Sequence, residues 1–359
     1  MTSTGPSAPT AEVGEVREAH RFDVKKLEAY AREAVDGFSG TLEVRQFSAG
    51  QSNPTFLLTE TSKSGTRRYV MRKKPPGQLL ASAHQVDREY RVMKALADTG
   101  VPVPHMYALC EDDSVIGTAF YIMEYLDGRV FTDATIPGAS GEERKALYDN
   151  LAMNLAKLHA VDYEAVGLSD FGRPGNYFER QVGRWIKQYR GAQTTDVPSM
   201  EELIKYLPDH IPNEQSVTIA HGDYRIGNVM FHPTEPRMIA VLDWELCTIG
   251  HPLADVAYNC MYDLMGVSSS APPIDRSIMP GLPTVDDHVA NYCRYAGRDH
   301  IENFNFYLAF SMFRLASISQ GVYKRGLDGN ASSERAMTLG DACATLANAA
   351  WDLVQKGDN

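Results

Sequence analysis

Residues 217–255 constrain the fold of this 359-residue chain more than any other segment. Two short apolar runs, Val229–Phe231 and Met238–Leu242, flank a turn-forming stretch with two prolines, and this pattern predicts a β-hairpin. Asn228 immediately precedes the first run and Asp243 immediately follows the second, so the hairpin would bring an amide oxygen and a carboxylate to one end. Mg²⁺ prefers such hard oxygen ligands and keeps phosphate oxygens in its shell, so the segment predicts a magnesium site.

A second acid, Asp223, precedes the hairpin at a spacing that is typical of kinases. The tripeptide HGD ends at Asp223, and four residues separate it from Asn228, which matches the H-x-D-x-x-x-x-N catalytic loop of kinases. Asp243 occupies the place of the metal-binding Asp of D-F-G, although the triplet here is DWE. The alternative is a loop Asp that caps a turn and a strand-end Asp on the surface. The combined motif favours the kinase interpretation, in which Asp223 accepts the proton of a substrate hydroxyl.

Further segments complete a family pattern: GQSNPTFLL (50–58), YVMRKKPPG (69–77), REYRVMKAL (88–96), HGDYRIGN (221–228), LDWELCTIGHPLAD (242–255) and FRLASISQGVYKR (313–325). On these motifs the chain resembles the aminoglycoside phosphotransferase family of the protein-kinase-like fold. Within that family it is most similar to the kinase-like domain joined to some acyl-CoA dehydrogenases. The resemblance implies an α+β, bilobal fold, with a small N-lobe built on an antiparallel β-sheet and one key helix, and a larger, mainly helical C-lobe. We therefore expect a disordered tail at 1–20, an N-lobe at 21–126 and a C-lobe at 127–359.

The predicted N-lobe holds the residues expected to bind a nucleotide. Ser52 and Asn53 lie in the turn that covers the phosphates in kinases, and their side chains and backbone N–H groups could contact phosphate oxygens. The usual G-x-G-x-x-G is absent, so an ordinary hairpin turn is the alternative. Glu124 and Leu126 follow an apolar strand, and by resemblance they belong to the hinge whose backbone groups bind adenine.

An arginine stands where kinases carry a phosphate-pairing lysine. Alternation along residues 69–72 places Arg72 on one face of a strand, and the helix predicted at 87–97 places Glu89 on its apolar stripe. Burying an unpaired acid is costly, so Glu89 needs a partner, and Arg72 is the candidate. Lys73 and Lys74 are neighbouring candidates for phosphate contact. A solvated basic face and a surface glutamate are the alternatives.

The predicted C-lobe contains residues with more than one interpretation. The helix at 177–190 is rich in aromatic and basic residues and either borders a substrate cleft or is simply amphipathic. Arg314 lies in an apolar helix and needs an acidic partner or a bound anion, of which we favour the acidic partner. His159 fits a capping or core position. By family analogy Asp255 braces the catalytic loop, and a last helix is expected over 334–354.

Composition excludes several classes of protein. A net charge of −11 disfavours a nucleic-acid-binding surface, and no apolar run approaches the ~18 residues of a transmembrane helix. The five cysteines form no metal-binding cluster, and the N-terminus lacks the basic start and apolar core of a secretory signal. A cytoplasmic protein with no nucleic-acid or membrane partner is the simplest expectation.

These features predict a small-molecule kinase that uses ATP and Mg²⁺ to phosphorylate a substrate hydroxyl. Arg225 stands two residues after Asp223, where protein kinases carry a lysine near the γ-phosphate, and would act with Asp223. The resemblance to the dehydrogenase-linked branch implies a hydroxyacyl substrate such as a hydroxyacyl-CoA. An aminoglycoside or amino-alcohol phosphotransferase and a non-catalytic nucleotide-binding pseudokinase are the alternatives.

Overall fold

The chain forms two compact units. The computed structural model describes residues 12–48, 53–75, 85–265, 276–329 and 334–357. One unit comprises the chain up to Phe131 together with Asn228–Cys247, and the other comprises Thr132–Gly227 together with the chain from Thr248 onward. The predicted boundary near residue 126 is close to Phe131, where the chain first passes from one unit to the other. The sequence prediction placed Asn228–Cys247 in the C-lobe, whereas this segment groups with the first unit.

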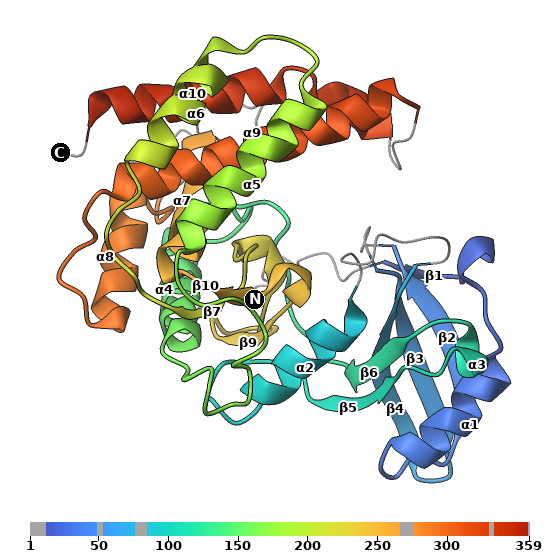
Figure 1. Ribbon diagram of the computed structural model, residues 1–359. Coiled ribbons are helices and arrows are strands. Elements are labelled where there is room, and N and C mark those ends of the chain that lie inside the picture. The colour runs from blue at the N-terminus through green and yellow to red at the C-terminus, as the bar shows by residue number, and fades with distance from the viewer. Residues whose placement is uncertain (1–11, 49–52, 76–84, 266–275, 330–333, 358–359) are drawn as a thin grey trace. The chain divides into compact units, whose positions relative to one another are not determined.

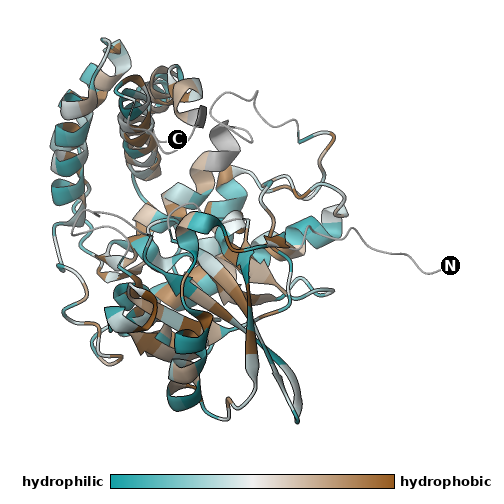
Figure 2. Ribbon diagram, turned by 90° about the vertical axis from the view of Figure 1, so that its right-hand side faces the viewer, coloured by the Kyte–Doolittle hydropathy of each residue, from teal (hydrophilic) through white to brown (hydrophobic). Residues whose placement is uncertain are grey.

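The first unit is built on a six-stranded antiparallel sheet in the order β1-β2-β3-β4-β6-β5 (Figure 1). Figure 2 shows both hydrophobic and hydrophilic residues along the strands, and in β3 buried and partly buried residues alternate from Thr55 to Glu60. The elements of this part are β1 (Val13–Gly14), the 3-10 turn η1 (Glu18–His20), α1 (Val24–Ala34), β2 (Thr41–Phe47), β3 (Thr55–Ser62), β4 (Gly65–Lys73), α2 (Val86–Leu96), β5 (Met106–Cys110), α3 (Asp113–Ile116) and β6 (Phe120–Glu124).

Helix α1 covers one face of this sheet. The Asp23 side chain caps the helix by accepting hydrogen bonds from two backbone N–H groups of the first turn. Leu27 of α1 is fully buried in a core that also contains Phe56 and Met71. Because side chains alternate along β4, Arg72 points to the opposite face, where α2 contributes Glu89.

Residues 12–20 are not the disordered tail that the sequence predicted. Val13 and Gly14 form β1, which pairs with the end of β2. The Gln46 side chain accepts a hydrogen bond from the Arg17 backbone N–H over 3.0 Å and lies 2.7 Å from His20. These long-range contacts fix a segment whose composition alone is typical of a tail.

The predicted hairpin forms, and it belongs to the first unit. Strands β8 (Val229–Phe231) and β9 (Met238–Val241) pair antiparallel. Arg129 and Phe231 exchange two backbone hydrogen bonds of 2.8 Å, and the Val241 N–H donates to the Pro102 carbonyl, also over 2.8 Å. These bonds attach the hairpin to the segments that flank the six-stranded sheet. The hairpin lies between the 3-10 turns η2 (Ile226–Asn228) and η3 (Trp244–Leu246).

The second unit is mainly helical, as predicted for the C-lobe. A two-stranded antiparallel sheet of β7 (Thr218–Ala220) and β10 (Thr248–Gly250) carries the loop after β7. Its other elements are α4 (Gly141–His159), α5 (Tyr177–Ala192), α6 (Pro198–Asp209), α7 (Pro252–Met265), α8 (Val285–Ala296), α9 (Phe304–Leu327), η4 (Glu334–Leu339) and α10 (Ala342–Lys356). The single last helix expected over 334–354 is instead the 3-10 segment η4 followed by α10. No described helix is long and apolar enough to cross a membrane.

Candidate active site

The predicted pair of Arg72 and Glu89 forms within the first unit. A guanidinium nitrogen of Arg72 lies 3.3 Å from a carboxylate oxygen of Glu89, whose side chain is only 1% exposed. Glu89 also accepts hydrogen bonds from Asn53 (2.7 Å) and Tyr121 (3.1 Å). Three partners therefore compensate for burial of the charge, which explains why an acid lies on the apolar stripe of α2.

The phosphate-loop prediction needs a correction at Asn53. Its side chain is fully buried and donates to Glu89, whereas the sequence suggested a side chain available to phosphate. Asn53 thus positions Glu89. Ser52, the other predicted loop residue, lies outside the described residues.

Arg72 contacts two further carboxylates that follow β9. It donates to Asp243 over 3.0 Å and lies 3.8 Å from Glu245. Its Nε is buried and has no hydrogen-bond partner among the residues that the structure describes. Sequence reasoning missed Glu245. The sequence did contain a signal for Glu245, because an acid occupies the third position of the triplet DWE, where the kinase triplet D-F-G has glycine.

The charges in this cluster are strongly coupled. Burial raises the pKa of Glu89 to about 7, and the charge of Arg72 opposes that rise. Burial acts to lower the pKa of Arg72, but Tyr121, Glu89 and Asp243 together hold it above its usual value. Arg72 therefore stays charged, and Glu89 is the member of the pair whose ionisation can change near neutral pH.

The two lysines after Arg72 do not share its environment. The ammonium of Lys73 lies 6.0 Å from the centre of the Phe56 ring, on the α1 face of the sheet, and burial lowers its pKa. Lys74 lies 3.9 Å from Asp87. Of the three basic residues, Arg72 is the one that contacts Asp243.

The predicted metal ligands lie at one end of the hairpin. Val229 pairs with Val241, and the Leu242 N–H donates to the Asn228 carbonyl over 2.8 Å, so Asn228 and Asp243 flank the same end. Asp243 has a left-handed backbone (φ 62°), which turns the chain out of β9. In the described part of the chain, no group of three or more His, Cys, Asp or Glu side chains could hold a metal. One amide and one carboxylate are nevertheless enough for Mg²⁺, which takes few protein ligands when phosphate and water complete its shell.

Asp223 lies in the second unit, in the loop after β7. Its side chain is 19% exposed, and one carboxylate oxygen lies 3.6 Å from Nε of Arg225. Its backbone N–H donates to Nδ1 of His221 over 3.2 Å, and His221 is fully buried. The loop thus presents an accessible carboxylate beside a cation.

Asp255 holds this loop, as the sequence predicted. Its two carboxylate oxygens accept hydrogen bonds from the backbone N–H groups of His221 (2.6 Å) and Gly222 (2.8 Å). His159 lies 3.3 Å from the same carboxylate and 2.9 Å from the Tyr292 hydroxyl, so its expected core position is confirmed. Burial acts to raise the pKa of Asp255, but the contact with His159 and these backbone bonds keep it below its usual value. A fully buried anion therefore fixes the residues immediately before Asp223.

Arg314 differs from its prediction. We expected an acidic partner, but the guanidinium donates to the Gly222 carbonyl over 3.0 Å. It lies over the rings of Trp185 (5.7 Å) and Tyr258 (5.3 Å). A sequence pattern cannot identify a carbonyl partner, because every residue has one.

The predicted hinge residues lie at the end of β6. The backbone N–H of Glu124 donates to the His105 carbonyl over 2.8 Å, and its side chain accepts from the His105 N–H over 3.1 Å. Leu126 is partly buried and lies two residues beyond the strand. No backbone hydrogen bond of Leu126 is found in the described ranges, so its backbone groups are available to a ligand.

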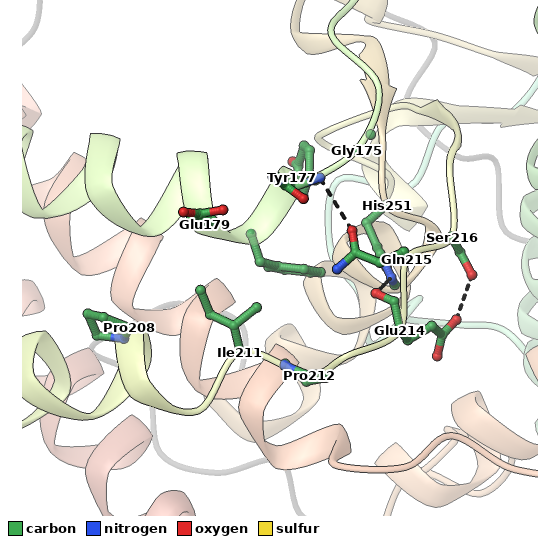
Figure 3. Close-up of a pocket in the computed structure, with 13 residues that line it drawn as sticks. Gly175, Tyr177, Glu179, Pro208, Ile211, Pro212, Glu214, Gln215, Ser216 and His251 are labelled. Atoms are coloured by element: carbon green, nitrogen blue, oxygen red, sulfur yellow. Dashed lines mark hydrogen bonds between the residues drawn. The ribbon is translucent and has the colours of Figure 1, made fainter.

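A separate cavity of about 210 Å³ lies in the second unit (Figure 3). It is lined by the start of α5, the segment that follows α6, and His251 with the glycine before it. Gln215 accepts a hydrogen bond from the Asn176 backbone N–H over 3.4 Å at its edge. None of the residues predicted to bind nucleotide or metal lines this cavity, but Tyr177, Phe178 and Glu179 do, at the start of the helix for which a substrate cleft was one of two interpretations.

Comparisons with known proteins agree with the fold and with the motifs. Residues 43–276 match the sequence profile of the phosphotransferase enzyme family. The chain is 45% identical over 347 residues to acyl-CoA dehydrogenase family member 10 of Mus musculus, covering 95% of this chain and 32% of that protein. It is 43% identical over 355 residues to acyl-CoA dehydrogenase family member 11 of Homo sapiens, covering 96% and 45% respectively. The chain thus spans less than half the length of these curated relatives.

Two solved structures illustrate the range of similarity. A Ralstonia eutropha protein provisionally described as an aminoglycoside phosphotransferase is 48% identical, with a TM-score of 0.85 over 94% of this chain and 100% of that one. An aminoglycoside phosphotransferase solved with ADP and hygromycin B is 15% identical, with a TM-score of 0.59 over 93% and 99% of the two chains. The second similarity supports the kinase-like fold alone.

Proposed function

The chain belongs to the phosphotransferase enzyme family, and from this membership we propose that it transfers the γ-phosphoryl group of ATP to a hydroxyl group of a small molecule, with Mg²⁺ as cofactor. One observation carries the proposal beyond family membership. The buried pair of Arg72 and Glu89 lies next to Asp243, which reproduces the strand-cation, helix-acid and metal-ligand arrangement of kinases.

The first unit would bind the nucleotide. Arg72, held by Glu89, would donate to the α- and β-phosphates, because a guanidinium has five N–H donors and can bind two partners at once. Asn228 and Asp243 would hold Mg²⁺, which when bound neutralises charge on the phosphates. The backbone groups of Glu124 and Leu126 would bind adenine, with Leu126 the better placed since the Glu124 N–H is already engaged.

The second unit would supply the groups that act on the acceptor. Asp223 would accept a hydrogen bond from the acceptor hydroxyl and take its proton late in the transfer. Arg225 would donate to the transferring phosphoryl group, whose charge in a loose transition state is spread over its oxygens. Asp255 contributes indirectly, because it fixes the backbone before Asp223.

The preferred acceptor class is a hydroxyacyl compound such as a hydroxyacyl-CoA. Similarity to two acyl-CoA dehydrogenase family members along nearly the whole of this chain supports that choice. An aminoglycoside or amino-alcohol acceptor is the second candidate, favoured by the description of the Ralstonia protein. The five cysteines are free and buried, which fits our expectation of a cytosolic enzyme.

An ATP-consumption screen over hydroxyacyl-CoAs, aminoglycosides and amino alcohols tests the proposal. We expect Mg²⁺-dependent turnover with an alcohol, and we expect Asp223→Ala and Asp243→Ala each to abolish it while the circular dichroism spectrum is retained. Near-normal turnover in either folded variant would refute the assigned roles. Nucleotide binding without turnover on any acceptor would identify a pseudokinase instead.

A further inference from the structure

Two guanidinium groups near the catalytic loop lack an acidic partner. Arg314 extends from α9 and Arg184 from α5, and α9 packs against both α5 and α7 (Figure 1). Arg314 lies over Trp185 of α5 and Tyr258 of α7, and Arg184 lies 5.7 Å from the centre of the Trp185 ring. Within the described ranges, no carboxylate lies at ion-pair distance from either arginine.

Some other arginines of the same unit pair with acids. Arg298 makes two bonds of 2.8 Å to the Glu214 carboxylate, and Arg190, on the same helix as Arg184, makes bonds of 2.5 and 2.6 Å to Glu201. The chain carries 46 acidic and 35 basic residues, so acids are not scarce. The lack of an acid beside the partly buried Arg314, in the described part of the chain, is therefore a local property of this site.

Another arginine of α5 bonds to two backbone carbonyls. Arg180 donates to the carbonyls of Gly175 and Arg173. Arg314 makes one such bond, to Gly222, which leaves most of its five donors for another acceptor. Arg314 is partly buried, whereas Arg184 is exposed. A partly buried cation without a counter-ion is costly, so an anion from outside the chain would stabilise Arg314.

The position of Arg314 links this cluster to the reaction. The carbonyl that it contacts belongs to Gly222, one residue or ~3.8 Å along the chain from Asp223. The charges of these arginines also act on the Tyr177 hydroxyl of α5. Burial raises the pKa of Tyr177, and Arg314, Arg184 and Arg180 act to lower it. An acceptor whose hydroxyl meets Asp223 can therefore place a second group against these arginines.

We propose that Arg314 and Arg184 bind an anionic group, a phosphate or a carboxylate, on the acceptor, with Trp185 beside it. The inference rests on the proposed function, because it assumes that the acceptor is held at Asp223. Guanidinium groups bind both anions through paired N–H donors, and ring faces hold the guanidinium planes in place. The acceptor class is thereby narrowed to hydroxyl compounds that carry a negative charge.

Direct binding to the full chain, saturated with a non-hydrolysable ATP analogue, tests this inference. The probes are two matched pairs, glycerol phosphate against glycerol and hydroxybutyrate against butanediol, which separate a phosphate source from a carboxylate source. We expect the wild-type protein to bind at least one anionic probe about tenfold or more tightly than its neutral counterpart. Arg184→Gln and Arg314→Gln should each abolish that preference.

The controls separate this site from other effects. Arg190→Gln changes the charge of the same helix equally but removes a paired arginine, and it should keep the preference. Arg184 makes no contact with the catalytic loop in the described structure, so its variant distinguishes anion binding from loop support. Equal affinity for anionic and neutral probes, or a preference that survives both substitutions, would overturn the inference. The binding experiment measures no turnover. A failure of the ATP-consumption screen would therefore count against the proposed function without changing the result for anion binding.

Discussion

The contacts of Asp255 allow the consequence of a single substitution to be worked out in advance. In Asp255→Asn the side chain keeps its size, but one of its two oxygens becomes an NH₂ group. That group would face a backbone N–H of His221 or Gly222, which now donate over 2.6 and 2.8 Å. One hydrogen bond to a charged acceptor is lost, and one buried N–H is left without a partner.

The magnitude follows from those two losses. A hydrogen bond to a charged group contributes roughly 1.5–3 kcal/mol, and an unsatisfied buried donor costs roughly 1–3 kcal/mol. We therefore expect the free energy of unfolding to fall by about 2.5–6 kcal/mol, a large part of the roughly 5–15 kcal/mol typical of a folded protein. The loop before Asp223 would also shift, and a displacement of ~1 Å can cost about 100-fold in rate.

Urea denaturation followed by circular dichroism measures the first effect, and kcat with the acceptor found in the screen measures the second. Asp149→Asn is the matched control, since it makes the same change at an exposed acid that contacts Arg294 and Tyr295. We expect that control to lose at most about 1 kcal/mol. If Asp255→Asn behaved like Asp149→Asn in both assays, the assignment of Asp255 as the support of the catalytic loop would be wrong.

Three further predictions concern other parts of the chain. The KM for ATP should rise as the pH falls through about 7, because protonated Glu89 no longer holds Arg72, and Glu89→Gln should raise KM and remove this pH dependence in steady-state assays. Burial lowers the pKa of His251 to about 4 from 6.5, so between these pH values only the unfolded state takes up the proton. The free energy of unfolding should therefore fall as the pH drops from 6.5 to 4. Urea midpoints measured over this range should fall less in His251→Gln than in the wild-type protein. In Gly250→Ala the added methyl group would lie 2.9 Å from the Tyr177 ring, so thermal unfolding should report a loss of about 1–3 kcal/mol.

Periodicity was enough to predict the contact between Arg72 and Glu89. The period of two along β4 and the helical stripe of α2 were enough to pair Arg72 with Glu89, because both patterns fix which face a side chain occupies. The hairpin was predicted because two apolar runs flank a proline-rich turn. Each of these features depends on residues close together in the sequence or on a strict repeat.

Features that depend on long-range contacts could not be predicted in the same way. Strands β7 and β10 have three residues each and pair across about 30 positions, so neither shows an alternating pattern. Residues 12–20 look like a tail because their order comes from Gln46 and β2. Asn53 could equally have faced solvent, and only the position of Glu89 in space decides its direction.

The substitution of arginine for the usual strand lysine also bears on whether this protein is catalytic. A lysine ammonium is a compact point charge, whereas the guanidinium of Arg72 already spans Glu89 at 3.3 Å and Asp243 at 3.0 Å with separate nitrogens. Under the proposed function Asp243 would hold Mg²⁺, and the Arg72 nitrogen that contacts Asp243 would then be available to a phosphate oxygen. Glu89 remains in place through Asn53 and Tyr121, so the arginine keeps its anchor during this exchange. An arginine in place of the lysine would therefore change the geometry of phosphate binding without removing the cation, which is compatible with the proposed phosphotransferase activity.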